Sequence, residues 1–493
     1  TASAALLNSA TTLNYQISGV EVAGGTASPS ADLGKVTGTV TIAAGATTGT
    51  ITLTPTDDGL TEGFEGFNVS ILDSAFATVA TSGNVVIMDG AQAGQTFSLT
   101  TSTDAITGTS GNDTINGVVT GDNASGTTIA AGDTITAGDG TDTVAISIAG
   151  AAAATGTTIS AVQFSGVETV TASNFQTDAT QTNGWSNAID MSLADTSLTN
   201  VALTASGATG DTKFTGITQI VDASMANGTG DLTLEYNSAA TVGTTDVQDL
   251  ALANQTAGTF TANGVETVSI TSSTLDNTVT VAGDAITTIN AAGNQTLNLG
   301  TVAATVTTLD ASAMTDEGVT ATLNAKTTIA VTGSAVADAI TTAAVLTTGT
   351  VDAGAGTDTV KLAADAHVAS TTLGAKYTNF ETLEITHTDS GNASPVTAWT
   401  DRTQDVSQVA GITKIGISNY ALTGTAGDDT DTATSVGFTN VGSAITDMAI
   451  SGLSHTDGTD VNDDTVALTV TTARATDTVA DTLTLTLGTA TAA

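Results

Sequence analysis

The 493-residue chain contains no cysteine, which excludes disulfide bridges and zinc–thiolate sites. Only three prolines occur, so no proline-rich linker separates domains. Aromatic residues make up 3% of the composition although 40% of the residues are hydrophobic. A single large globular core normally uses more aromatic residues. A stacked solenoid needs few of them, because each layer buries small or β-branched side chains against its neighbours.

Basic residues are also scarce. Eight Lys and Arg stand against 49 Asp and Glu, which gives a net charge of −41. A nucleic-acid partner is excluded, because little in the chain could neutralise a phosphate backbone. The acidity serves solubility or is matched by divalent cations, of which about 20 calcium ions would balance it. No apolar run reaches membrane-spanning length.

Signatures of enzymes are missing as well. Only three histidines occur, and neither a G-x-S-x-G elbow nor an H-E-x-x-H zinc motif is present. A glycosidase needs only two carboxylates, so a polysaccharide-acting β-helix enzyme stays open as an alternative. The two tryptophans and the few basic residues are scattered, however, which disfavours a sugar-binding cleft. We therefore expect a protein that is not an enzyme.

A repeated glycine–aspartate pattern is the main feature that the sequence does contain. Residues 131–144 read AGDTITAGDGTDTV, in which Asp133 and Asp142 are nine residues apart. Small and acidic residues suit turns and β-branched residues suit strands, so the stretch predicts turn, strand, turn, strand. It resembles the RTX nonapeptide repeat, which forms a parallel β-roll with calcium between its turns.

Related segments recur further along the chain. GDGTDTV from residue 138 matches GAGTDTV from residue 354, and FSGVETV, NGVETV and YTNFETL share a Glu–Thr pair. Asp113 lies 225 residues before its counterpart Asp338, whereas Asp142 lies 216 residues before Asp358. The difference of nine predicts that the second copy lacks one repeat unit. Two Asp-Ala-Ser segments, at 222–224 and 310–312, are interpreted as turns.

Residues 1–92 predict a separate antiparallel β-sandwich. Strand-like alternation occurs at residues 13–18, 36–43, 50–55, 66–72 and 84–88. The segments GTVTIAAGATTGTI, DDGLTEGFEGFNVSIL and VVIMD resemble the Calx-β domain in order and spacing. That resemblance implies calcium at Asp57, Asp58, Glu62, Glu65 and Asp89.

Further calcium ligands are expected in the body of the chain. In a β-roll, an aspartate of one turn and main-chain carbonyls of the next converge on the cation. The candidates at matching places are Asn112, Asp113, Asp133, Asp139, Asp142, Asp358, Asp428 and Asp429. A denser acidic cluster near the C-terminus adds Asp457, Asp460, Asp463 and Asp464. The alternative is that these residues are good turn formers with no metal.

These patterns predict an all-β fold, with an N-terminal antiparallel β-sandwich (1–92) and a parallel β-solenoid in two related copies (93–335 and 336–493). The combination resembles RTX-related surface-layer and large adhesin proteins of Gram-negative bacteria. The resemblance implies a secreted cell-surface protein, exported by a type I-like route, that binds Ca2+ and assembles with itself into a layer, matrix or filament. Cell-surface polysaccharide is a further expected partner.

Calcium would couple to folding, so we expect a poorly ordered chain in calcium-free buffer. An adhesin segment that binds a host, polysaccharide or ice surface is the alternative function. The sequence starts at Thr1 and shows no basic segment followed by an apolar segment, as a signal peptide would. This is expected of a processed product, a piece of a longer protein or a chain exported without such a peptide.

Overall fold

The computed structural model describes most of the chain in two compact units. The described residues are 9–21, 29, 31–55, 64–88, 93–120, 126–151, 157–159, 161–177, 187–323, 325, 327–363, 367–388, 402–423, 435–451, 454–456, 467–472 and 484–487. The first unit comprises Thr1–Phe97 with the short segments Thr107–Thr114 and Ala137–Asp142, and the second unit holds the remaining residues. No helix among the described residues is long and apolar enough to cross a membrane.

An antiparallel sheet dominates the first unit, as the sequence predicts. Its order is β2-β1-β3-β4, and β5 also pairs with β3. Alternating residues of the sheet, among them Tyr15, Ile17 and Phe67, are buried in one core. The strands are β1 (Thr11–Val20), β2 (Thr37–Ile42), β3 (Phe64–Leu72), β4 (Thr78–Thr81) and β5 (Val85–Met88).

One strand expected in this unit does not form. Residues 50–55 belong to none of the strands among the described residues, although Ile51 and Leu53 pack against the core while staying partly exposed. Their apolar alternation therefore serves to cover the sheet. The strand β4, by contrast, was not expected, because its sequence TVAT is short and all of its residues are exposed.

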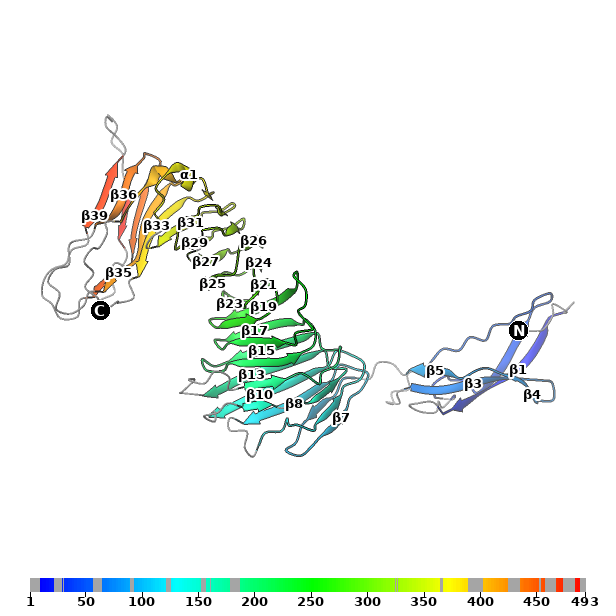
Figure 1. Ribbon diagram of the computed structural model, residues 1–493. Helices are drawn as coiled ribbons and strands as arrows, with labels where there is room; N and C mark the ends of the chain where they lie inside the picture. The colour runs from blue at the N-terminus through cyan, green and yellow to red at the C-terminus, as the bar shows by residue number, and fades with distance from the viewer. Residues whose placement is uncertain are drawn as a thin grey trace. The chain divides into compact units, whose positions relative to one another are not determined.

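The body of the chain is a parallel solenoid, in which strands of successive turns lie side by side (Figure 1). We use the word rung for one such turn. The longest sheet has thirteen strands in sequence order: β6 (Thr96–Ser98), β8 (Thr114–Thr120), β10 (Thr143–Ala151), β13 (Thr169–Thr177), β15 (Asn200–Ser206), β17 (Asp222–Gly228), β19 (Val247–Gln255), β21 (Thr267–Ser273), β24 (Thr288–Gly293), β26 (Thr308–Met314), β28 (Ala330–Thr332), β30 (Thr350–Asp352) and β32 (Tyr377–Thr378).

Shorter sheets complete the rungs. A six-stranded sheet contains β11 (Thr157–Ile159), β14 (Asn187–Asp190), β16 (Thr212–Ile217), β18 (Leu232–Tyr236), β20 (Thr259–Ala262) and β23 (Thr280–Ala282). A ten-stranded sheet contains β22 (Asn277–Thr278), β25 (Leu297–Thr301), β27 (Val319–Leu323), β29 (Ala339–Thr342), β31 (Thr359–Ala363), β33 (Thr382–Thr388), β35 (Lys414–Thr423), β37 (Asp447–Ser451), β38 (Ser454–Thr456) and β40 (Thr484–Leu487).

Two sheets of three strands and two short helices make up the remainder. The first of these sheets holds β7 (Ala105–Thr107), β9 (Thr134–Thr136) and β12 (Gln163–Ser165), and the second holds β34 (Arg402–Asp405), β36 (Ser435–Val441) and β39 (Ala467–Thr472). The helices are α1 (Thr371–Gly374) and a 3-10 turn, η1 (Val406–Gln408).

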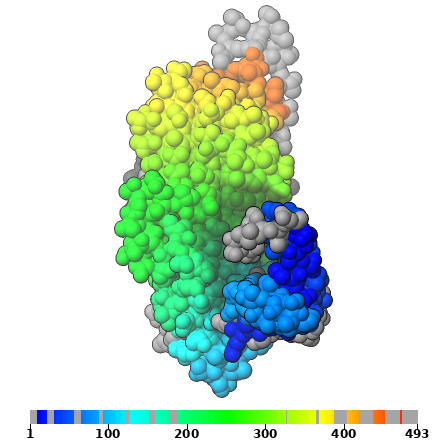
Figure 2. Space-filling model, turned by 90° about the vertical axis from the view of Figure 1, so that its right-hand side faces the viewer, coloured from blue at the N-terminus to red at the C-terminus, as the bar shows by residue number. Residues whose placement is uncertain are grey.

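Aliphatic residues in register form the core of the solenoid. Val268, Ile289, Leu309, Val331 and Val351 are aligned on consecutive strands of the long sheet, and each is at most 2% exposed. Neighbouring strands lie about 4.8 Å apart, so each side chain packs on a similar one above and below. This arrangement explains why few aromatic residues are needed. Figure 2 shows the colours following one another from green to yellow along the stack.

The rungs are longer than the nonapeptide suggests. Thr288 pairs with Thr308, Thr308 with Ala330, and Ala330 with Thr350, so these rungs are 20 to 22 residues long. The parallel solenoid is therefore confirmed, but nine residues are less than half of one such rung.

Candidate functional site: carboxylates between rungs

The predicted ligand Asp358 precedes β31 and is fully buried. Its Oδ1 accepts a 2.7 Å hydrogen bond from the main-chain N–H of Asp338, which lies 20 residues earlier on the preceding rung. Asp338 is also buried, and both of its carboxylate oxygens accept main-chain N–H groups. Its Oδ1 accepts from the N–H of Val319 at 2.6 Å, and its Oδ2 accepts from the N–H of Ser334 at 2.7 Å.

Glu381 continues this chain of bonds on the next rung. Its Oε2 accepts from the N–H of Asp358 at 2.8 Å. Burial is the main cause that raises the pKa of Asp358 to about 6; the hydrogen bond from the Asp338 N–H lowers it, and the nearby charges of Asp338 and Glu381 raise it. Oδ2 of Asp358 is buried and accepts no hydrogen bond from the described part of the chain. The negative charge of Asp358 therefore destabilises the folded state.

The first copy of the motif has the same geometry within the first unit. Oδ1 of the buried Asp142 accepts from the N–H of Asp113 at 2.6 Å, 29 residues earlier. Asp113 in turn accepts from the N–H of Gln95 at 2.5 Å and of Thr109 at 2.6 Å. The two bonded aspartates are 29 residues apart in the first copy and 20 residues apart in the second. The second copy therefore lacks nine residues in this rung.

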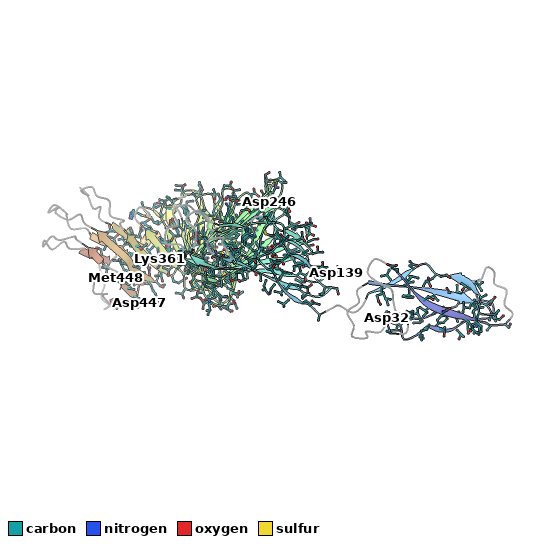
Figure 3. The ribbon with its side chains drawn as sticks, turned by 90° about the horizontal axis from the view of Figure 1, so that it is seen from below. Asp32, Asp139, Asp246, Lys361, Asp447 and Met448 are labelled. Carbon is teal, nitrogen blue, oxygen red and sulfur yellow. The ribbon has the colours of Figure 1, made fainter. Side chains whose placement is uncertain are left out.

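The other residues of the first motif differ in burial. Asp133 is buried and accepts from the N–H of Asp104 at 2.9 Å and of Ala130 at 2.8 Å. Asn112 accepts through Oδ1 from the N–H of Thr141 at 2.9 Å. Asp139, labelled in Figure 3, is exposed in the turn between two glycines.

Glycine is required where the rungs come closest. A Cβ at Gly138 would lie 2.0 Å from the carbonyl oxygen of Thr109, and a Cβ at Gly354 would lie 2.0 Å from that of Ser334. Both glycines also have positive φ, +108° and +91°, which side chains disfavour. The repeated glycines therefore allow main chains of successive rungs to approach each other.

The Glu–Thr motif makes a second kind of inter-rung bond. Oε2 of Glu266 accepts from the N–H of Asp246 at 2.9 Å. The carbonyl oxygen of Glu266 accepts from the N–H of Thr287 at 2.9 Å and from its Oγ1 at 3.3 Å. Asp246 lies at the outer side of the stacked strands in Figure 3. Glu381 repeats the pattern with Asp358 and Thr413. Each glutamate thus links its own rung to both neighbours.

An acidic side chain that accepts a main-chain N–H from the preceding rung is termed a rung anchor. Several of them are predicted calcium ligands, whereas Asp338 and the glutamates of NGVETV and YTNFETL, Glu266 and Glu381, are marked in the sequence only by their recurrence. The anchors include Asp113, Asp133, Asp142, Asp195, Glu266, Asp284, Glu317, Asp338, Asp358 and Glu381.

The described anchors form no cluster of carboxylates of the kind that calcium prefers. Calcium prefers six to eight oxygen ligands, several of them carboxylates. Among the described residues, no three acidic or histidine side chains converge where they could hold a metal ion. Both carboxylate oxygens of Asp113, Asp133 and Asp338 accept N–H groups. Their chemistry is that of hydrogen-bond acceptors.

The remaining candidates are placed as follows. Glu65 is 8% exposed on β3. The others lie outside the described residues: Asp57, Asp58, Glu62, Asp89, Asp428, Asp429, Asp457, Asp460, Asp463 and Asp464. Calcium at these positions stays a prediction.

Comparison with known proteins gives the chain no family, since neither protein-family models nor curated proteins match it.

Proposed function

We propose that this chain is a secreted structural protein whose solenoid is a stiff element of a self-assembled cell-surface layer, matrix or filament. The observation that supports it best is the recurrence of the rung anchors. Their carboxylates are spent on main-chain N–H groups of neighbouring rungs, so each rung is held in register with the next. Stiffness along the stack follows from such repetition of nearest-neighbour contacts.

We propose that calcium binds to the acidic segments that lie outside the described residues. The resemblance to Calx-β and RTX sequences supports calcium at residues 57–62 and 428–429, and the dense acidic cluster supports it at residues 457–464. With a net charge of −41, copies of the chain repel each other, and divalent cations would lower that repulsion. We therefore assign calcium to assembly, while the described rung anchors accept main-chain N–H groups without it.

An adhesin segment is the second candidate, and one observation favours it. Thr267, Thr288, Thr308 and Thr350 share one register position on the long sheet, where Ala330 interrupts the row. This position precedes the buried aliphatic row, so it belongs to the opposite face of the sheet. A row of hydroxyl groups at regular spacing could bind an ordered surface such as a polysaccharide or ice.

Sedimentation velocity of the full chain separates the two candidates. The structural protein is expected to form large species whose fraction rises with protein concentration and with calcium. A chain that stays monomeric under all these conditions, yet is retained on polysaccharide or ice, would favour the adhesin and refute the structural proposal.

A further inference from the structure

In the described part of the first unit, β4 and β5 form one edge of the antiparallel sheet. β1 pairs with β3 along Gly66–Leu72. β4 pairs with β3 at Ser70–Leu72, and β5 pairs with β3 at Phe64–Phe67. Because β1 occupies one side of β3, both β4 and β5 lie on its other side, end to end. Together they form an edge that pairs with no further strand among the described residues. We term it the β4–β5 edge.

Exposed apolar side chains concentrate on this edge. Val79 is 66% exposed, Val86 52% and Val85 42%, and Phe76, in the turn before β4, is 70% exposed. The stretch Thr78–Met88 reads TVATSGNVVIM and has no charged residue. Natural proteins usually protect open edges with charges, proline or bulges, because an unprotected edge pairs with another strand. The β4–β5 edge lacks charge and proline in a chain with 49 acidic residues.

Phe76 adds a conformational argument. Its φ is +62°, a left-handed conformation that disfavours bulky side chains. Asp73 holds the turn, since its Oδ1 accepts from the N–H groups of Ala75 at 2.8 Å and Ala77 at 2.9 Å. Glycine would suit this position better, and the exposed ring gains little from packing inside the unit. A cost of this kind is repaid when the ring contacts a partner.

We propose that a second copy of this chain binds through the β4–β5 edge, its own β4–β5 edge adding antiparallel about a two-fold axis. This inference rests on the proposed function and names the contact that assembly would use. Charge favours this partner at Thr78–Met88: two chains of −41 can meet along this stretch because neither brings a carboxylate there, and apolar side chains then cover each other. The opposite edge, β2, already buries its Val40 and Ile42 in the unit's own core.

A cysteine cross-link tests the two-fold contact, because the chain has no other thiol. Gly83 lies between β4 and β5, near the middle of the edge, and no atom lies within 4 Å of a Cβ added there. Gly83→Cys is expected to give disulfide-linked dimers under mild oxidation. Gly442→Cys is the matched control, since its Cβ also meets no atom within 4 Å, and it should give at least about tenfold less dimer.

Charged side chains at the edge provide the second test. The pair Val79→Lys and Val86→Lys, both at exposed sites, should raise the dissociation constant of the dimer at least about tenfold. Val242→Lys, at a site 80% exposed in the second unit, should leave it unchanged. If the chain self-associates but neither the cross-link nor the lysine pair differs from its control, the edge is overturned and the structural function stands. If the chain never self-associates, both fall.

Discussion

The main-chain N–H of Asp338 donates a 2.7 Å hydrogen bond to Oδ1 of Asp358, a fully buried carboxylate on the next rung. Asp113 and Asp142 form the same bond at 2.6 Å in the first copy of the motif. An inter-rung bond conserved between copies that differ in rung length shows that the aspartate is tied to the main chain of its neighbour.

The charge of Asp358 should make stability depend on pH. Its pKa is raised from 3.8 to about 6, so between these values the folded chain binds a proton more readily than the unfolded chain. The contribution of Asp358 to the free energy of unfolding therefore falls as pH rises through this window, by roughly 3 kcal/mol. Asp358→Asn keeps an acceptor oxygen but removes the charge, so the variant should lose this dependence and exceed the wild type in stability at neutral pH.

Denaturant unfolding curves across that pH window measure the effect of Asp358→Asn. Asp139→Asn, at an exposed turn position, is the control and should unfold like the wild type at each pH. A variant at position 358 that is less stable than the wild type at neutral pH would show that the charge itself is stabilising, as a cation ligand would be.

The close approach at Gly354 should not tolerate a side chain. Gly354→Ala places a Cβ 2.0 Å from the carbonyl oxygen of Ser334 at a φ of +91°, so we expect a loss of about 2 kcal/mol or more in unfolding free energy. Gly442→Ala, where the added Cβ meets nothing, should change stability by less than about 1 kcal/mol. Equal midpoints for the two variants in thermal unfolding would refute the account of rung packing.

The glutamate of the Glu–Thr motif should protect one amide from exchange. Glu266→Ala leaves the N–H of Asp246 without its acceptor, which costs about 1–3 kcal/mol and should speed hydrogen exchange at that amide. Glu266→Gln retains an acceptor oxygen and should exchange at close to the wild-type rate. If the alanine variant protects the amide as well as glutamine does, the side-chain bond is not present in solution.

Removing calcium tests whether the rung anchors need a cation. The acidic sequence predicts a poorly ordered chain without calcium, whereas carboxylates that accept N–H groups of the neighbouring rung favour a solenoid that folds without it. We expect the strand signal in circular dichroism to persist in excess chelator. Loss of that signal, restored by calcium, would show that the solenoid itself requires the metal.

Much of the fold could be predicted because a solenoid repeats its own local rules. Alternating apolar residues and Gly–Asp turns indicated parallel strands, and the antiparallel first unit followed from its strand spacing. The length of a rung was less visible, since nine residues mark the distance between neighbouring aspartates in the sequence rather than a full turn. Asp133 and Asp142 are nine apart, yet each accepts a hydrogen bond from a residue 29 positions earlier.

The Asp-Ala-Ser segments show why composition misleads in such a chain. They were expected to be turns, but they lie within β17 and β26. Their alanines, Ala223 and Ala311, are at most 2% exposed, because the neighbouring rungs lie close enough for a methyl group to fill the core. A small residue therefore indicates either a turn or a close contact, and the sequence alone does not distinguish them. A similar ambiguity holds for the aspartates, whose carboxylates suit both hydrogen bonds to the main chain and a metal ion.

Electron microscopy of the negatively stained full chain, in calcium and in excess chelator, tests the proposed function most directly. We expect extended, regular assemblies in calcium and smaller species in chelator, with the strand signal in circular dichroism retained in both buffers. Isolated single particles at every protein concentration in both buffers would contradict it.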